Sequence, residues 1–193
     1  MSAPVRCRWC EGDREYTRYH DEEWGVPLYD NRRLFEFLIL DGAQAGLSWL
    51  TILKRREAYR AAFDGFNAEK IARYGEKDIK RLMNDSGIIR NRLKINSAIK
   101  NAQGYLAFME GPQSFSDWLW SFTGGVPVVN TFKAHGEIPA STPLSKTISS
   151  ELKKRGFTFA GPVIIYAFMQ AAGLVNDHIT GCFRWQEVQK AGR

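Results

Sequence analysis

The chain has 193 residues, of which 44% are hydrophobic and 25% are charged. This composition is typical of a folded globular protein of one domain or two closely packed subdomains, and it excludes a disordered or fibrous chain. No apolar run approaches the ~20 residues that cross a bilayer. The formal net charge of +6 at pH 7 favours a polyanionic partner, with nucleic acid as the commonest one.

Cysteine usage and the first residues predict a compartment. The three cysteines are an odd number, and charged residues interrupt the N-terminus before an apolar signal-peptide core can form. Both features predict a reducing, cytoplasmic setting without a disulfide framework.

Helix signals dominate from residue 30 onward. Asp30 or Asn31 can cap a helix over 32–40, and a second amphipathic stretch covers 47–63. Further helices are predicted over 68–74, 77–84, 92–109, 115–122, 144–155 and 162–172. Glycines and prolines make 124–143 a loop, in which 126–129 is the one short strand candidate. The helix over 162–172 is apolar almost all round and should be buried. The sequence therefore predicts an all-α fold.

Two pairs of metal-binding residue types lie at opposite ends of the chain. They are Cys7 with His20, and His178 with Cys182. The second pair has one-turn spacing, and four such ligands suit a closed, tetrahedral zinc site that would clip the two ends together. A chance occurrence of these four residues is an equal alternative, and Cys10 is a fifth candidate ligand. His135 lies in a polar stretch and is best read as an exposed loop histidine.

Residues 41–49 combine an acid and an indole with small residues. In one helix, Asp41 and Trp49 would share a face, and the glycines and alanines between them would leave space. This arrangement suits a flat cationic ligand, because an indole stacks on a cation and a carboxylate neutralises it. Close helix packing, with Asp41 as a cap, explains the same residues. Other large aromatics lie nearby: Trp9 and Tyr19 could line a stacking pocket, whereas core packing best explains Trp24.

The stretch 82–95 has the outline of a helix-hairpin-helix, a motif that grips DNA without reading its sequence. A helix ends near Asn84, a hairpin is centred on Gly87, and a basic helix follows with Arg90, Arg92 and Lys94. Glycine allows a close approach to a phosphate, and helix N-terminal amides bind anions. An ordinary turn between two helices fits these residues equally well.

Five strings resemble the bacterial 3-methyladenine DNA glycosylase I family. They are residues 19–27, 44–49, 86–90, 153–159 and 173–178, and the similarity extends from about 7 to 182. The resemblance implies a helix-hairpin-helix DNA glycosylase fold with one structural zinc joining the termini. It places the zinc on Cys7, His20, His178 and Cys182, and leaves Cys10 outside.

The resemblance also implies a function and its residues. A member of this family hydrolyses the N-glycosidic bond of N3-methyladenine in alkylated double-stranded DNA, after base flipping, and releases free 3-methyladenine. Trp9, Tyr19 and Trp49 would line the lesion pocket, with Asp41 and Tyr19 as the catalytic residues. The family typically has glutamate where this chain has Asp41, which is shorter by about 1.5 Å of reach. Contacts with DNA are expected at Gly87, Ile88, Arg90 and Lys94.

The expected organisation is a single glycosylase domain over 1–193, monomeric and without a membrane partner. Core helices would span about 30–145, and zinc would join the segments 1–29 and 146–193. Two other classes of function fit parts of the sequence. One is a non-catalytic, zinc-stapled DNA-binding module, for which Asp41 is a disabling change. The other is a zinc hydrolase, which would require a water in place of one of the four ligands.

Overall fold

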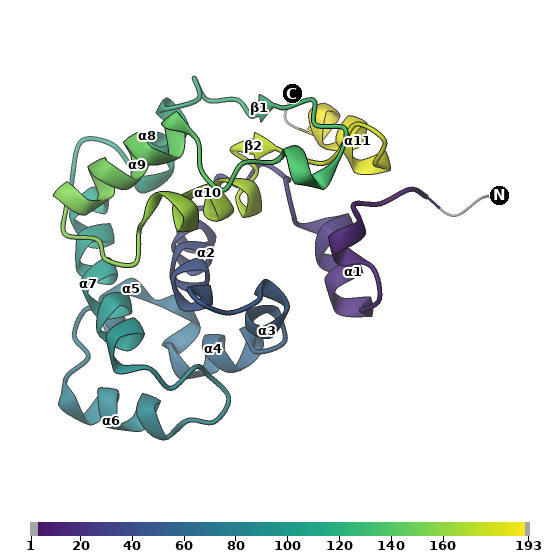
Figure 1. The fold of residues 1–193 in the computed structure, drawn as a ribbon. Coiled ribbons are helices and arrows are strands. Elements are labelled where there is room, and N and C mark those ends of the chain that lie inside the picture. Colours follow the sequence, from purple (N-terminus) through teal and green to yellow (C-terminus); the bar gives the residue numbers. More distant parts are fainter. Residues whose placement is uncertain (1–3, 192–193) are drawn as a thin grey trace.

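The computed structural model describes residues 4–191, with side chains described as far as residue 190. Helices make up most of this part of the chain (Figure 1). The elements are η1 (Arg8–Cys10), α1 (Arg14–Glu22), α2 (Asn31–Gln44), α3 (Trp49–Leu53), α4 (Arg56–Ala62), η2 (Asp64–Phe66), α5 (Ala68–Ile71), α6 (Glu76–Asn84), α7 (Arg92–Met109), α8 (Phe115–Ser121), β1 (Val128–Val129), η3 (His135–Glu137), α9 (Pro143–Lys154), α10 (Pro162–Ala171), β2 (Val175–Asn176) and α11 (Phe183–Ala191). The mostly helical prediction is confirmed.

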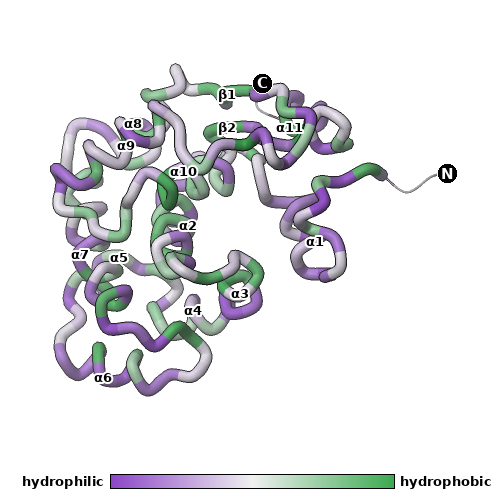
Figure 2. The backbone as a smooth tube through the Cα atoms, viewed as in Figure 1, coloured by the Kyte–Doolittle hydropathy of each residue, from purple (hydrophilic) through white to green (hydrophobic). Residues whose placement is uncertain are grey.

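Helix α2 lies at the centre and packs against α3, α7, α8 and α10. Leu34, Phe35 and Leu40 on this helix are almost completely buried. In Figure 2, α1 and α6 are largely hydrophilic, whereas α2 and α10 carry hydrophobic stretches. The apolar core is therefore built around α2 and α10.

Side-chain caps set several helix starts where the sequence placed them. The Asp30 carboxylate accepts a hydrogen bond from the Arg33 amide at 2.8 Å, and the Asn91 side chain accepts from the amides of Leu93 and Lys94 at 2.9 and 3.2 Å. These bonds satisfy amides that have no partner within the helix. The predicted helix over 92–109 is confirmed, and the one predicted from 32 continues to Gln44.

The prediction of one helix over 47–63 is wrong. Two short helices, α3 and α4, occupy this stretch and are separated at Lys54 and Arg55. The Arg55 guanidinium donates to the carbonyls of Ser86 and Gly87 in the hairpin. An amphipathic pattern cannot distinguish one long helix from two short ones that bury the same face.

The all-α prediction is incomplete, because β1 pairs with β2 in a two-stranded parallel sheet. Val128 lies opposite Val175, and Val129 lies opposite Asn176. The strand candidate at 126–129 is therefore confirmed in part. The sheet places the residues just before His178 beside the loop that follows α8.

Helices α1 and α11 were not predicted. In α1 the polar sequence hides a capped helix, since the Asp13 carboxylate accepts from the amides of Glu15 and Tyr16 at 3.0 and 3.1 Å. Helix α10 is less enclosed than predicted, because Val163 at its first turn is 58% exposed. Within the described residues, no helix is both long and apolar enough to span a membrane.

Candidate functional site

A cavity of about 260 Å³ opens between α1, α2, α3 and α10. It is lined by Trp9, Tyr16, Tyr19, Trp24, Asp41, Gln44, Trp49, His135, Ala167, Gln170 and Ala171. The structure thus brings together the four residues that the resemblance placed in a lesion pocket, although they come from four different elements.

Aromatic rings form much of the cavity wall. The ring centroids of Tyr19 and Trp49 are 5.5 Å apart, and those of Trp9 and Tyr16 are 4.7 Å apart. Trp24 meets Trp9 edge to face at 5.0 Å. Tyr16 is an addition that the sequence did not single out, and Trp24 both packs in the core and lines the cavity. Such walls can stack on a planar ligand from more than one side.

Asp41 supplies a buried carboxyl group on the last turn of α2. It is 3% exposed, and its Oδ2 has no hydrogen-bond partner among the described residues. Burial raises the pKa of Asp41 well above its ordinary value. The indole nitrogen of Trp49 is likewise buried and unpartnered within the described chain. Buried polar atoms are nearly always paired, so two orphans in one cavity indicate a ligand that bonds to them.

The route by which Asp41 and Trp49 meet differs from the prediction. They were expected on one face of a continuous helix, but α2 ends at Gln44 and α3 begins at Trp49. The intervening turn contains Gly46 at φ +78°, in a left-handed conformation that favours glycine. The turn, rather than helical periodicity, brings the two side chains into one cavity, and Ala45 and Ser48 do not line it.

Tyr19 is 2% exposed and lines the same cavity as Asp41. Burial, followed by the negative charge of Asp41, raises the pKa of Tyr19 well above its ordinary value. The side chain is therefore a neutral phenol at physiological pH.

Gln170 is a further lining residue that the sequence did not reveal. Its amide nitrogen donates to Asp177 Oδ2 at 2.7 Å, and Asn130 donates to Oδ1 of the same carboxylate at 2.6 Å. Since a carboxylate only accepts, these bonds fix which end of the Gln170 amide faces Asp177. His135 is exposed, as predicted, but it lies on η3 and also borders the cavity.

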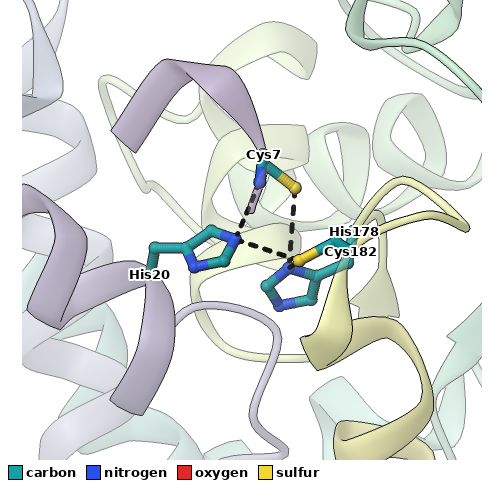
Figure 3. A group of neighbouring side chains, drawn as sticks. All are labelled: Cys7, His20, His178 and Cys182. Atoms are coloured by element: carbon teal, nitrogen blue, oxygen red, sulfur yellow. Dashed lines mark hydrogen bonds between the residues drawn. The ribbon is translucent and has the colours of Figure 1, made fainter. Parts of the chain in front are cut away.

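A second cluster lies where the two ends of the chain meet (Figure 3). Cys7, His20, His178 and Cys182 are all buried, and their ligand atoms lie within 4.8 Å of one another. The Sγ atom of Cys182 is 3.4 Å from His20 Nε2 and 3.7 Å from His178 Nδ1. Cys7 Sγ is also 3.7 Å from His178 Nδ1. Bond lengths of ~2.3 Å to sulfur and ~2.0–2.1 Å to nitrogen give a sulfur–nitrogen edge of ~3.6 Å in a tetrahedron.

Both imidazoles are oriented by a second hydrogen bond. His20 Nδ1 is 2.7 Å from Asp21 Oδ1, and Arg6 pairs with Asp21 at 2.8 Å. His178 Nε2 is 3.0 Å from the Trp24 carbonyl. Each partner accepts a hydrogen bond from one ring nitrogen. The other ring nitrogen then carries no proton and can bind a metal, as is usual for metal-binding histidines.

The sulfur atoms separate into two groups. The Cys7 side chain, helped by His178 and His20, lowers the pKa of Cys182 well below its ordinary value. Cys10 instead donates its thiol to the Cys7 carbonyl at 3.0 Å and does not belong to the cluster. Burial raises the pKa of Cys10 to about 11. The cluster can hold a metal with four protein ligands, and Cys10 has a structural role beside it.

The helix-hairpin-helix outline is present, with residues 85–91 between α6 and α7. Gly87 serves packing: a Cβ at this position would lie 2.8 Å from the Cβ of Ala58 on α4. Its amide donates to Asp85 Oδ1 at 2.8 Å. Ile88 is 3% exposed and belongs to the apolar core, so its side chain cannot contact DNA. Arg90 is exposed.

Lys94 has a different environment from the one expected. Its ammonium donates to the carbonyls of Ala43 and Ala45, both at 2.7 Å. The Asn91 side chain also occupies the amides of Leu93 and Lys94. The predicted anion site at the start of α7 is thus partly closed, and of the two basic side chains proposed for phosphate contact Arg90 is the exposed one.

Comparisons with known proteins agree over nearly the whole chain. The methyladenine glycosylase family model matches residues 9–185. DNA-3-methyladenine glycosylase 1 of Escherichia coli (strain K12) is 51% identical over 177 residues, which cover 92% of this chain and 95% of that protein.

Solved structures show the same similarity in three dimensions. A crystal structure of 3-methyladenine DNA glycosylase I is 52% identical with a TM-score of 0.91, and the match covers 93% of this chain and 98% of that one. A Staphylococcus aureus 3-methyladenine DNA glycosylase I, whose structure concerns 3-methyladenine recognition, is 40% identical with a TM-score of 0.90 and coverage of 94% and 97%. The chain therefore belongs to the methyladenine glycosylase family.

Proposed function

We propose that this protein is a DNA glycosylase that hydrolyses the N-glycosidic bond of N3-methyladenine in alkylated double-stranded DNA and releases free 3-methyladenine. One observation carries the choice of substrate: the cavity places a buried, unpartnered Asp41 carboxyl among aromatic rings. A permanently cationic purine gains both cation–π contacts, worth about 0.5–2 kcal/mol each, and a charged acceptor. Normal adenine, which is neutral, gains no cation–π contact and no charge pairing with the carboxylate.

The chemistry demands little from the protein. Methylation at N3 leaves the purine positively charged, which weakens the bond from N9 to the sugar. When that bond breaks, its electron pair goes to the base and neutralises it, water supplies the hydroxyl at C1′, and the water's second proton goes to solvent. We assign the contacts to the reacting base to Asp41 and Tyr19, with stacking from Trp9 and Trp49. The shorter reach of Asp41, compared with the family's usual glutamate, requires the base to sit closer to α2 or a water to bridge.

The position of the cavity supports base flipping. Tyr19, Asp41 and Trp49 in its wall are buried, so a base stacked in a duplex cannot reach them. The nucleotide must leave the stack at a cost of a few kcal/mol. Phosphate contacts at the hairpin, with Arg90 as the exposed cation, would hold the strand without reading its sequence.

We further propose that the Cys7, His20, His178 and Cys182 cluster holds one structural zinc. The donor set of two sulfurs and two nitrogens, its near-tetrahedral spacing and the hydrogen bonds behind both imidazoles support this assignment. Four protein ligands leave no open position for a metal-bound water, which argues against the zinc-hydrolase alternative. With the two ends joined in this way, residues 1–193 would form a single domain.

An assay of abasic sites tests the proposal against a non-catalytic DNA-binding module. The purified protein is incubated with methylated duplex DNA, and strand breaks are counted before and after alkali. A hydrolase without lyase activity leaves intact strands that break only after alkali, and Asp41→Asn serves as the matched control. If the parent binds the DNA and creates no alkali-sensitive sites, the non-catalytic alternative is correct.

A further inference from the structure

Lys94 forms a bridge between two parts of the molecule that have separate functions in the proposed enzyme. It is the third residue of α7, the helix that begins directly after the hairpin at 85–91. Its Nζ lies 2.7 Å from the carbonyl oxygens of both Ala43 and Ala45. These carbonyls lie at the C-terminal end of α2, about 50 residues away in sequence. In the chain they lie between Asp41 and Trp49, which line the cavity.

The chemistry of a helix end explains why a cation is placed there. The last carbonyls of a helix have no amide partner within it and carry the negative end of the helix dipole. Around Ala45 the backbone bond to the Gly42 carbonyl is long, at 3.4 Å. Hydrogen bonds from an ammonium to two such carbonyls are charge-assisted and strong. A second backbone bond in the turn, from the Leu47 amide to the Gln44 carbonyl, is short at 2.6 Å. Lys94 therefore adds two charge-assisted hydrogen bonds to a turn that also has its own backbone bonds.

Lys94 is also less exposed than a lysine on a DNA-binding surface should be. The side chain is half-buried, and desolvation lowers the pKa of Lys94. No carboxylate pairs with it in the part of the chain that the structure covers. By contrast, Lys100 lies two turns further along the same helix and is exposed. A half-buried ammonium that is already bonded to two carbonyls is poorly placed to bind a phosphate.

We infer that Lys94 is a positioning residue, which fixes the turn between α2 and α3 against the hairpin that meets DNA. This turn joins Asp41 and Gln44 on α2 to Trp49 on α3. The inference rests on the proposed function, since it concerns the lesion pocket of that enzyme. Lys94 does not touch the base. Lys94 fixes the position of the turn between α2 and α3 relative to the hairpin at 85–91, which would bind the DNA strand.

The affinity for free 3-methyladenine and the affinity for undamaged DNA together distinguish a positioning role from a phosphate contact. Lys94→Met keeps most of the side-chain stem and removes the ammonium. We expect it to bind free 3-methyladenine about tenfold more weakly, as is typical when a charged hydrogen bond is lost, and to bind undamaged DNA with the parent's salt dependence. A phosphate-binding lysine gives the opposite pattern: unchanged affinity for the free base, and a slope of log affinity against log salt that is smaller by about one.

Matched variants complete the test. Lys100→Met, on the same helix and outside the pocket, should leave the affinity for the free base unchanged. If Lys94→Met does not fold, Lys94→Arg replaces it, because a planar guanidinium keeps the charge but cannot place one compact donor between the two carbonyls. The positioning role predicts weaker free-base binding and parent-like DNA binding for Lys94→Arg as well. Parent-like affinity for the free base in the folded Lys94 variant would overturn the inference. The proposed function fails separately, if the parent itself releases no 3-methyladenine from methylated DNA.

Discussion

Asp41 is a buried carboxyl group that we assign to the lesion, and Asp41→Asn removes its charge with little change in shape. The substitution therefore tests the role of the charge in excision and its effect on stability. The carboxyl lies in the cavity with Oδ2 unpartnered, so in the complex it can bond to a cationic base that brings its own charge. Removing a hydrogen bond to a charged partner costs about 1.5–3 kcal/mol, a tenfold to hundredfold loss in affinity. We expect single-turnover excision of 3-methyladenine to fall by that factor, with aromatic stacking preserved.

The same substitution should change stability in the opposite direction. Burial raises the pKa of Asp41 in the folded state, whereas in the unfolded chain the pKa of this carboxyl group is about 3.9. Above that pH the unfolded state releases its proton first, so the free energy of unfolding decreases until the pH passes the folded-state pKa. Asn carries no such penalty. At pH 7 Asp41→Asn should therefore unfold at a temperature no lower than the parent, and its advantage should shrink as the pH is lowered toward 4.

Calorimetric unfolding across this pH range, together with single-turnover excision, measures both effects on the same samples. Asp41→Glu restores the family's usual side chain and should excise at least as fast as the parent if reach alone limits Asp41. Asp41 lies on the last turn of α2 and Asp30 caps that helix, so the capping role considered for Asp41 is wrong. The alternative is that Asp41 only fills space in the wall, in which case Asn, which has nearly the same shape, replaces it without loss. Parent-like excision by Asp41→Asn would refute the assignment of Asp41 to the lesion.

Three other predictions concern metal, DNA and substrate. Protein purified without chelator should contain one zinc per chain, and Asp21→Asn, which removes the partner of His20 Nδ1, should weaken zinc affinity by about 10–100-fold; metal analysis and competition with a chelator check both values. Arg90→Ala should reduce the slope of log DNA affinity against log salt by about one, as measured by titration at several salt concentrations, whereas an unchanged slope would place the DNA on another face. Excision should be confined to small cationic N3-methylated purines, and efficient release of uracil or 8-oxoguanine from duplex substrates would contradict a pocket that rewards positive charge.

Local signals predicted the parts of the fold that local chemistry controls. The cap at Asp30 and the helices predicted over 92–109, 144–155 and 162–172 depend on the chemistry of short segments. The break between α3 and α4 was missed, because it depends on hairpin carbonyls that bind Arg55 from about 30 residues away. The two-residue strands were beyond reach for the same reason, since each is defined only by its partner.

The candidate site shows the same division. Sequence strings sufficed to bring Trp9, Tyr19, Asp41 and Trp49 together through the family resemblance, but helical periodicity gave the wrong reason for the last two. Tyr16 and Gln170 carried no signal, because the cavity that they line forms only when elements far apart in the sequence come together. Lys94 shows the limit most clearly: a basic residue after a hairpin suggests DNA, and only the carbonyls of Ala43 and Ala45 reveal its actual contacts.

The central claim is that the cavity around Asp41 accepts the methylated base and that the protein cuts it from DNA. The most direct measurement is chromatographic identification of the purines set free when excess protein is incubated with methylated duplex DNA. The account predicts that 3-methyladenine appears in a single rapid phase, with normal purines left in the DNA and with a much slower phase for Asp41→Asn. Retention of 3-methyladenine in DNA that the zinc-loaded, folded protein demonstrably binds would contradict it.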